Sequence, residues 1–260
     1  MLRFVINLDS SKDRFNSISK RLGELGVSFE RISAIDGRKL PSEQIEELTY
    51  PYNHFESRVR FPRELTKGEV GCFLSHRKCW QRLLESDEQW ALIIEDDIKI
   101  SDSASPFMTS TDWIPSNVDI CKLSSSVPVE HGRILEETIT LDGGISLVAA
   151  LSPPPLGTQC YLISRKAAKT ALDLSERLPA PVDVFLFSRL FEFPNVYTIW
   201  RVAPTLVVPN EEIESDIGHR TKKSIKKAPF FVRHGITRFL LNKKLKKLRR
   251  EGKEFTFLFE

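Results

Sequence analysis

Cysteine is scarce in this sequence. Four residues, Cys72, Cys79, Cys121 and Cys160, occur in 260 positions. None belongs to the closely spaced pairs that hold structural zinc, so the sequence gives no zinc-binding motif. The opening MLRFVINLDSS turns polar too early for a signal peptide, and we therefore expect a cytoplasmic protein. In that compartment the four thiols are expected to be reduced and to pack as small hydrophobic side chains.

Long apolar runs and glycine-rich phosphate loops are also missing. No hydrophobic stretch reaches the roughly 18 to 20 residues that a membrane span requires. The chain has no G-x-G-x-x-G sequence, which leaves a dinucleotide-binding site unsupported. Its 41% hydrophobic and 28% charged residues are typical of a globular protein with a substantial core.

Charge is unevenly distributed along the chain. Residues 218–260 hold 14 Lys and Arg against 3 Asp and Glu, whereas residues 1–217 hold 24 basic and 32 acidic residues. We therefore divide the chain into an acidic body, 1–217, and a basic C-terminal segment, 218–260. Such asymmetry indicates a partner for the basic part.

The most informative stretch is WALIIEDDIKI, residues 90–100. Its apolar run predicts a strand that is buried on both faces. Glu95, Asp96 and Asp97 follow at its carboxyl end, where ligands bind in open α/β sheets. Three adjacent carboxylates repel one another unless a cation compensates, and a divalent ion with nucleotide phosphates would do so. A solvated acidic turn is the alternative.

The first 37 residues predict a strand, a helix and a second strand, over residues 3–8, 12–25 and 29–35. A βαβ unit of this kind makes the two strands parallel neighbours. Ser10 or Ser11 is expected to cap the helix, and Gly26 to end it. Asn7, Asp9 and Asp36 lie at or after the strand ends. From these segments alone, we favour the interpretation of Asp9 and Asp36 as turn residues over a role in a site.

A further helix precedes the acidic strand. Thr66 and Glu69 form a capping box that places its start near Lys67. His76 lies at the edge of the apolar stripe of this helix. It is either a histidine at the edge of the core or a residue that faces a ligand cleft.

The second half predicts mainly strands. We expect strands over residues 118–125 and 159–164, a hairpin around Asp142–Gly144, and a last strand pair within residues 198–209. Helices are expected over residues 165–174, with Ser164 as the cap, and from Asp183 to Phe191. Asp183 then lies in the first helical turn, where an acidic residue also suits the helix dipole.

Four blocks carry a family resemblance: INLDSSKDR, AIDG, LTKGEVGCFLSHRKCW and ALIIEDD. In this order and spacing they resemble glycosyltransferase family 25, over roughly residues 1–217. The resemblance implies a GT-A-like α/β fold with a mixed, mostly parallel central sheet flanked by helices, followed here by a basic helical tail. It also implies a nucleotide-sugar donor (typically UDP-galactose), a divalent metal such as Mn²⁺ or Mg²⁺, a lipooligosaccharide acceptor and inversion at the anomeric carbon.

The resemblance suggests roles for single residues. Asp97 is the expected metal ligand, with His219 as a second one, and Asp183 is the expected catalytic base, with Glu69 and Glu211 as substitutes. Residues 153–158 are expected to form the acceptor wall. The residues expected to bind the nucleotide sugar are Asn7, Asp9, Arg14, Asp36, Lys67, Glu69, His76, Glu95 and Asp96.

Other functions remain open at this stage. A metal-dependent sugar nucleotidyltransferase would use similar acids but normally has a glycine-rich loop near its start. A non-enzymatic membrane-surface protein could hold Ca²⁺ with the same acids. The basic segment, in which apolar and basic residues interleave over residues 224–250, suits an anionic inner-membrane surface. It equally suits a helix packed on the core, and no motif indicates nucleic acid.

Overall fold

We describe a computed structural model of the chain over residues 1–50, 63–125, 129–152, 156–188, 197–213 and 254–258. The helices are α1 (Lys12–Glu24), α2 (Ser42–Leu48), α3 (Lys67–Leu84), α4 (Ser105–Thr109), α5 (Arg165–Asp173) and α6 (Val182–Phe187). The strands are β1 (Leu2–Asn7), β2 (Glu30–Ser33), β3 (Trp90–Glu95), β4 (Ile98–Ile100), β5 (Ile120–Lys122), β6 (Val129–Thr140), β7 (Ser146–Ser152), β8 (Cys160–Ser164), β9 (Ile199–Ala203), β10 (Val207–Pro209) and β11 (Glu254–Leu258).

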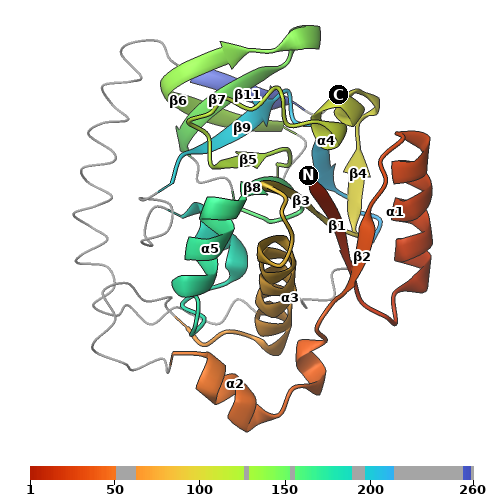
Figure 1. Ribbon diagram of the computed structural model, residues 1–260, viewed down its shortest axis with the longest axis vertical. Coiled ribbons are helices and arrows are strands. Elements are labelled where there is room, and N and C mark those ends of the chain that lie inside the picture. Colours follow the sequence, from red (N-terminus) through yellow and green to blue (C-terminus); the bar gives the residue numbers. More distant parts are fainter. Residues whose placement is uncertain (51–62, 126–128, 153–155, 189–196, 214–253, 259–260) are drawn as a thin grey trace.

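A mixed sheet forms the centre of the molecule, as Figure 1 shows, and its strand order is β11-β6-β7-β9-β5-β8-β3-β1-β2. The expected βαβ unit is confirmed, because β1 pairs in parallel with both β2 and β3. Its register sets Ile6 opposite Glu95 and Asn7 opposite Ser33. The polar ends of these three strands therefore meet at one edge of the sheet.

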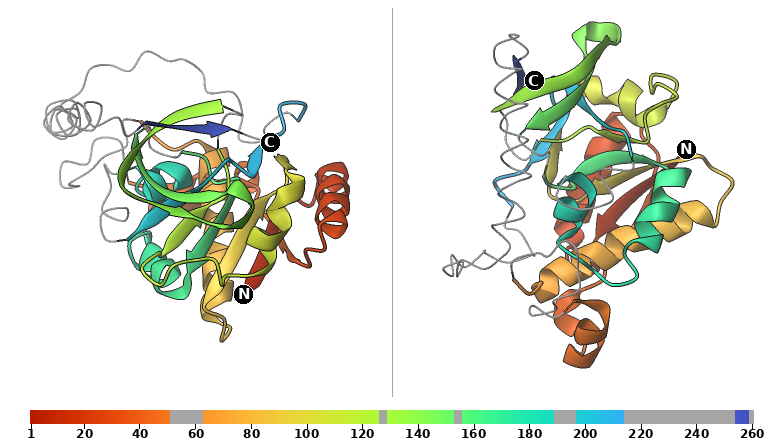
Figure 2. Two further views of the ribbon diagram at one scale, coloured as in Figure 1. Left: turned by 90° about the horizontal axis from the view of Figure 1, so that it is seen from above. Right: turned by 90° about the vertical axis from the view of Figure 1, so that its left-hand side faces the viewer.

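Helices cover both faces of this sheet (Figures 1 and 2). On one face α3, α5 and α6 pack over residues such as Phe4, Ile93 and Tyr161. On the other, α1 and α4 pack over Val5, Leu92 and their neighbours. This arrangement explains why ALII is apolar throughout: successive side chains point to opposite faces, and both faces are buried. The α/β architecture with flanking helices is thus confirmed.

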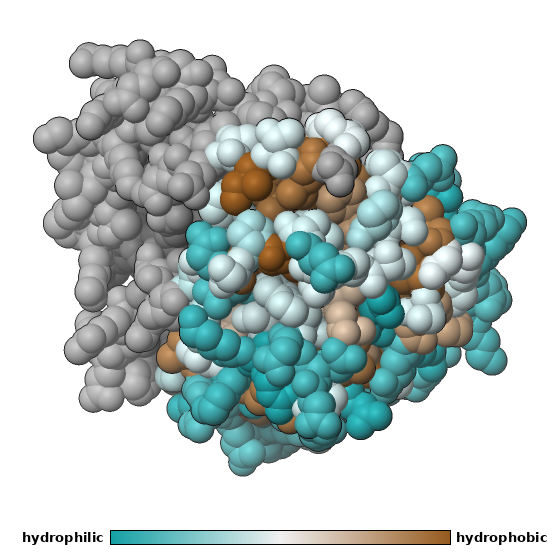
Figure 3. Space-filling view, turned by 45° about the horizontal axis from the view of Figure 1, so that its top comes forward, coloured by the Kyte–Doolittle hydropathy of each residue, from teal (hydrophilic) through white to brown (hydrophobic). Residues whose placement is uncertain are grey.

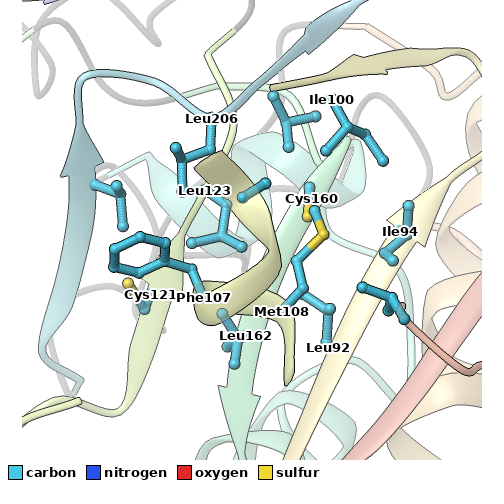
Figure 4. Close-up of a cluster of buried hydrophobic side chains, with 14 of the residues drawn as sticks. Leu92, Ile94, Ile100, Phe107, Met108, Cys121, Leu123, Cys160, Leu162 and Leu206 are labelled. Carbon is cyan, nitrogen blue, oxygen red and sulfur yellow. The ribbon is translucent and has the colours of Figure 1, made fainter. Parts of the chain in front are cut away.

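Figure 4 shows the core beneath α4. Phe107 and Met108 of α4 belong to one buried cluster with Leu92, Ile94 and Leu162 of the sheet. The same cluster holds the buried thiols Cys121 and Cys160, and all four cysteines are free. The expected packing of thiols as small hydrophobic side chains is confirmed for Cys79, Cys121 and Cys160, whereas Cys72 is only partly buried.

Helix boundaries mostly follow the local signals. Thr66 and Glu69 make the expected capping box of α3, Ser164 caps α5, and Gly26 has the positive φ that ends α1. The cap of α1 is different from the expectation. Ser11 occupies the N-cap position, but its hydroxyl accepts a hydrogen bond from the side chain of Arg14 rather than from a backbone amide.

The hairpin around residues 142–144 is confirmed as β6 and β7. The two strands expected within residues 198–209 are present as β9 and β10, but they do not pair with each other. Instead, β9 lies between β5 and β7, and β10 pairs with β4 in a separate small sheet. The helix that begins beside Asp183 is α6, and residues 189–191 of the expected helix lie outside the described residues.

Within the described residues, no helix is both long and apolar enough to cross a membrane. The face shown in Figure 3 is largely hydrophilic, with smaller hydrophobic patches between the polar side chains. The expected basic helix over 224–250 lies outside the described residues. Near its far end, β11 adds an antiparallel strand to β6 at the edge of the main sheet.

Candidate active site

The three carboxylates follow β3 at the point where the chain leaves the main sheet. Glu95 ends the strand, Asp96 and Asp97 form the turn, and β4 starts the small sheet. The turn is fixed because the amide of Asn210 donates to the carbonyl of Asp97 at 2.8 Å. A carboxylate cluster is thereby held on a rigid part of the fold.

Among these carboxylates, Asp97 has a strongly raised pKa. Burial, reinforced by the charges of Glu95 and Asp96, raises the pKa of Asp97 to about 7. Its buried Oδ1 atom has no hydrogen-bond partner within the described part of the chain. A buried carboxylate oxygen without a donor, beside two further acids, suits a hard divalent cation. The expected metal-binding role of Asp97 fits these observations and stays a prediction.

Asp96 is held by residues from the first strand and helix. The amide of Asn7 donates to its Oδ2 at 2.5 Å, and Arg14 lies 3.4 Å from the same oxygen. The guanidinium of Arg31 in turn donates to the Asn7 carbonyl oxygen at 2.8 Å and to Asp9 at 2.7 Å. Asn7 is 2% exposed, so it orients its neighbours rather than offering a free amide to a ligand.

Asp9 and Asp36 are both satisfied locally. Hydrogen bonds from Ser33 and Arg31 lower the pKa of Asp9. Asp36 caps the short turn at Gly37–Lys39 and accepts from Arg38, which lowers the pKa of Asp36. Asp36 also lines a cavity described below, so its turn role and its expected nucleotide role are compatible.

Glu95 ends a buried chain of hydrogen bonds. The indole N–H of Trp80 lies 3.1 Å from the Tyr161 hydroxyl, which lies 2.9 Å from His76 Nδ1. His76 Nε2 lies 3.2 Å from Glu95 Oε1. Since an indole only donates, the Tyr161 hydroxyl accepts from Trp80. His76 Nε2 is the ring nitrogen that faces Glu95.

This chain fixes the ionisation of Glu95. Burial by itself disfavours the charged form, but hydrogen bonding and charge from His76, with the Thr158 hydroxyl at 2.6 Å, outweigh it. The pKa of Glu95 therefore lies below its ordinary value. His76 is 0% exposed, so the two readings of this histidine combine. It is a satisfied core residue, and it acts on the site by orienting Glu95.

Two cavities meet at Glu95. The first, of about 100 Å³, lies beside the strand ends and is lined by Asn7, Arg14, Asp36, Gly37, Asp96 and Asp97, among others. The second, of about 380 Å³, is lined by Glu69, Leu156, Gly157, Thr158, Gln159 and Asp183, among others. Glu95 and Cys72 belong to both walls. Glu95 is therefore accessible to whatever occupies either cavity.

Side chains from three elements hold one wall of the second cavity. Lys122 of β5 donates to the carbonyl of Leu156, Asp183 of α6 accepts from the amide of Gly157 at 3.1 Å, and Thr158 donates to Glu95. The expected acceptor wall is therefore ordered at residues 156–158, and residues 153–155 lie outside the described residues. Asp183 faces this cavity, but it also fixes the loop and accepts from the amide of Val184.

The remaining candidates contribute less. Glu69 borders the second cavity, but Arg63 and the Thr66 amide occupy its carboxylate. The Lys67 ammonium group bonds to the Leu40 carbonyl at 3.4 Å and lines neither cavity, so the structure does not bring it to the expected phosphate position. Glu211 is exposed away from both walls. His219 lies outside the described residues.

Sequence reasoning missed Arg31, Tyr161 and Cys72. Arg31 reaches the site only because β2 pairs with β1 in this register. Tyr161 lies in the apolar run of β8, so the sequence suggests only a core residue. Its hydroxyl comes within reach of His76 because β8 pairs with β3. Cys72 had a usable signal: it precedes His76 by four residues on a helix, which puts both on one side.

The chain was compared with known proteins. Residues 1–186 match the model of a protein family described as "Glycosyltransferase family 25 (LPS biosynthesis protein)". A glycosyltransferase 25 family member of Aedes aegypti is 31% identical over 230 residues, covering 82% of this chain but only 36% of the relative. The lacto-N-neotetraose biosynthesis glycosyltransferase LgtB of Neisseria meningitidis is 26% identical over 210 residues, covering 74% of this chain and 70% of that protein.

Among solved structures, a glycosyltransferase involved in glycosylation of the major capsid of PBCV-1 aligns with 82% of this chain and 95% of its own, at a TM-score of 0.42 and 10% identity. The chain spans about a third of the length of the mosquito relatives, at 36% of each. The family match covers well over half of the sequence and includes the acidic strand end and the helix before it. This chain belongs to glycosyltransferase family 25.

Proposed function

We propose that this chain transfers a hexose, galactose from UDP-galactose, to a lipooligosaccharide acceptor with inversion at the anomeric carbon. The observation that carries the proposal is the buried Oδ1 of Asp97, which has no hydrogen-bond partner among the described residues and belongs, with Glu95 and Asp96, to the wall of a cavity. Relatives named for lacto-N-neotetraose biosynthesis, lipooligosaccharide biosynthesis and procollagen galactosyl transfer support this substrate class.

The residues at the strand ends fit a divalent cation, which Asp97 would hold with Glu95 or Asp96 assisting. A bound Mn²⁺ or Mg²⁺ supplies Lewis-acid stabilisation to the charge that grows on the leaving diphosphate. Arg14 adds a positive charge to the same cavity. Asn7 and Arg31 keep Asp96 in place, so the acids do not reorganise when the donor binds.

Asp183 is the proposed base for the acceptor hydroxyl. It lines the second cavity, across Glu95 from the carboxylates of the first. An inverting displacement needs the attacking oxygen on the side opposite the leaving group, and two cavities that share one wall supply two such sides. Glu95 remains charged at this junction, where it can interact with the sugar that is transferred.

Alternative functions receive less support. A sugar nucleotidyltransferase and a calcium-dependent surface protein both use carboxylates, but neither accounts for the family match over residues 1–186. A donor-hydrolysis screen separates these functions. The chain is incubated with UDP-galactose, UDP-glucose and UDP-N-acetylglucosamine, each with Mn²⁺, Mg²⁺ or a chelator, and release of UDP is measured.

We expect metal-dependent release of UDP, fastest from UDP-galactose. Asp97→Ala should lower turnover by at least about 100-fold while the protein stays folded. No release of UDP from any donor, or release that is equal in the chelator, would remove the proposed function. A preference for UDP-glucose would change only the named sugar.

We also propose that the basic segment, residues 218–260, contacts an anionic membrane surface from the cytoplasmic side. Its support is the surplus of 14 basic over 3 acidic residues. Truncation is a poor test because it also removes β11, which pairs with β6. Replacing Lys243, Lys244, Lys246 and Lys247 with Gln is the sharper change. It should weaken sedimentation with anionic vesicles, and unchanged sedimentation would end this part of the proposal.

A further inference from the structure

A thiol, an imidazole and a carboxylate converge in the wall between the two cavities. The ligand atoms of Cys72, His76 and Glu95 all lie within 4.8 Å of one another. Cys72 and His76 are four residues apart on α3, so they project from the same side of the helix. Glu95 reaches them from the end of β3. The proposed transfer reaction has no use for the thiol.

The spacing of these atoms is close to that of a tetrahedral metal site. Zinc binds imidazole nitrogen at about 2.0–2.1 Å and carboxylate oxygen at about 2.0–2.2 Å, which puts two tetrahedral ligands about 3.3–3.5 Å apart. His76 Nε2 and Glu95 Oε1 are 3.2 Å apart. A thiolate on the same ion lies about 3.6 Å from the other two ligands, and a shift of roughly 1 Å brings the sulfur there.

The surroundings already orient these ligands. The Tyr161 hydroxyl lies 2.9 Å from His76 Nδ1, the ring nitrogen that faces away from Glu95. The Thr158 hydroxyl donates to Glu95 at 2.6 Å. Such outer partners fix the ring orientation and the basicity of metal ligands. The second cavity, of about 380 Å³, leaves room for water at a fourth position.

We propose that Cys72, His76 and Glu95 form a zinc-binding site, separate from the oxygen-only site at Asp97. Thiolate and imidazole select zinc over magnesium or calcium. When zinc binds, the Cys72 thiol releases its proton, and His76 coordinates through Nε2 as a neutral imidazole whose ring proton is on Nδ1, beside the Tyr161 hydroxyl. The hydrogen bond between His76 and Glu95 is replaced by two bonds to the metal. Because zinc occupies the Glu95 carboxylate, Glu95 can no longer interact with the transferred sugar, and bound zinc inhibits the transfer reaction. Only this inhibitory consequence rests on the proposed function.

Cobalt is the probe for this site, because a thiolate bound to Co²⁺ gives a charge-transfer band in the near ultraviolet that oxygen ligands do not give. We expect the full-length chain to show this band with Co²⁺ and to lose it on addition of Zn²⁺ but not of Mg²⁺. Cys72→Ser should abolish the band. Cys79→Ala, which changes a buried thiol of the same helix, and Asp97→Asn should keep it, with folding checked by circular dichroism.

Absence of the band in the unaltered chain, or its survival in Cys72→Ser, would overturn the zinc site. So would its loss in a folded Asp97→Asn protein. A measurement without variants guards against misfolding: Zn²⁺ should slow alkylation of Cys72, mapped by mass spectrometry, and Mg²⁺ should not. Equal alkylation with and without zinc would also overturn the proposal. None of these readouts depends on sugar transfer.

Discussion

Gly71 of α3 and Gly37 of the neighbouring turn approach so closely that a β-carbon on Gly71 would lie 2.5 Å from the backbone nitrogen of Gly37. The same atom would lie 2.4 Å from the carbonyl oxygen of Ile35. This contact brings the start of α3 against the turn that carries Asp36. The first cavity is built around it, since Asp36, Gly37 and Cys72 all line its wall.

Gly71→Ala should therefore destabilise the protein, because the backbone that it meets cannot move aside without shifting the turn. Overpacking of this kind costs roughly 1 to 3 kcal/mol or more. The measurement is the free energy of unfolding by denaturant. Gly23→Ala is the matched control. An alanine β-carbon there meets nothing within 4 Å, and because this position of α1 is exposed, the protein should gain up to about 1 kcal/mol of stability. Equal effects of the two changes would contradict this description of the contact.

The pH dependence of stability should reveal Asp97. Its pKa rises from an ordinary value of 3.8 to about 7 on folding, so the metal-free folded protein binds a proton that the unfolded chain releases between these values. Stability then falls as pH rises through this range, by at most about 1.4 kcal/mol per pH unit.

Asp97→Asn should remove this slope and stabilise the metal-free protein at pH 8. Thermal unfolding of both proteins from pH 4 to pH 8, in a chelator, is the measurement. Adding Mn²⁺ at pH 8 should stabilise the unaltered chain and not the variant. If the stabilities of the two proteins changed with pH in parallel, the pKa of Asp97 would not be raised on folding.

Tyr161→Phe should weaken both the core and the site. Removing the hydroxyl leaves the Trp80 indole N–H and His76 Nδ1 without their partner, at about 1 to 3 kcal/mol for each unsatisfied group. It also frees the imidazole that orients Glu95, so kcat should fall more than KM rises. Tyr197→Phe, at a partly exposed tyrosine whose hydroxyl donates to the backbone carbonyl of Lys166 at 3.3 Å, is the control. Unfolding by denaturant and steady-state kinetics measure the two effects, and a Tyr161→Phe protein as stable and active as the control would refute the buried chain.

Asp183→Asn separates the two roles of that residue. An asparagine oxygen can still accept the Gly157 amide hydrogen at the second cavity, but the amide cannot take a proton from an acceptor. If Asp183 is the base, turnover should fall by at least about 100-fold. Stability should fall by only about 1 kcal/mol, because the Val184 amide loses its carboxylate acceptor. Asp173→Asn, at an exposed residue paired with Lys169 on α5, should change neither quantity. Near-normal turnover in Asp183→Asn would leave Asp183 only its role in holding the loop.

Local signals predicted much of the fold. The βαβ unit, the capping box at Thr66 and the hairpin near residues 142–144 each depend on neighbours in sequence, and all are confirmed. The tip of β3 was recognised because an apolar run ending in three acids is unusual. Long-range pairing was not predictable: β10 joins β4 rather than β9 because the chain leaves the main sheet twice, and the sequence does not mark this.

The site was predicted residue by residue with less success. Asn7 and Asp96 were both candidates, yet their mutual hydrogen bond follows from the parallel register of β1 and β3. Lys67 was placed near the phosphates from charge alone, and the structure directs it to the Leu40 carbonyl instead. The His76 chain required knowledge that β8 pairs with β3, which no single segment carries.

The most direct test of the central claim is calorimetric titration of UDP into the full-length protein, with and without Mn²⁺, for the unaltered chain and for Asp97→Asn. If the tip of β3 binds the metal and diphosphate together, Mn²⁺ should strengthen UDP binding by at least about 10-fold in the unaltered chain. In Asp97→Asn, the affinity for UDP should be the same with and without Mn²⁺. Binding of UDP that is equally tight with and without Mn²⁺, or strengthened by Mn²⁺ to the same degree in Asp97→Asn, would contradict it.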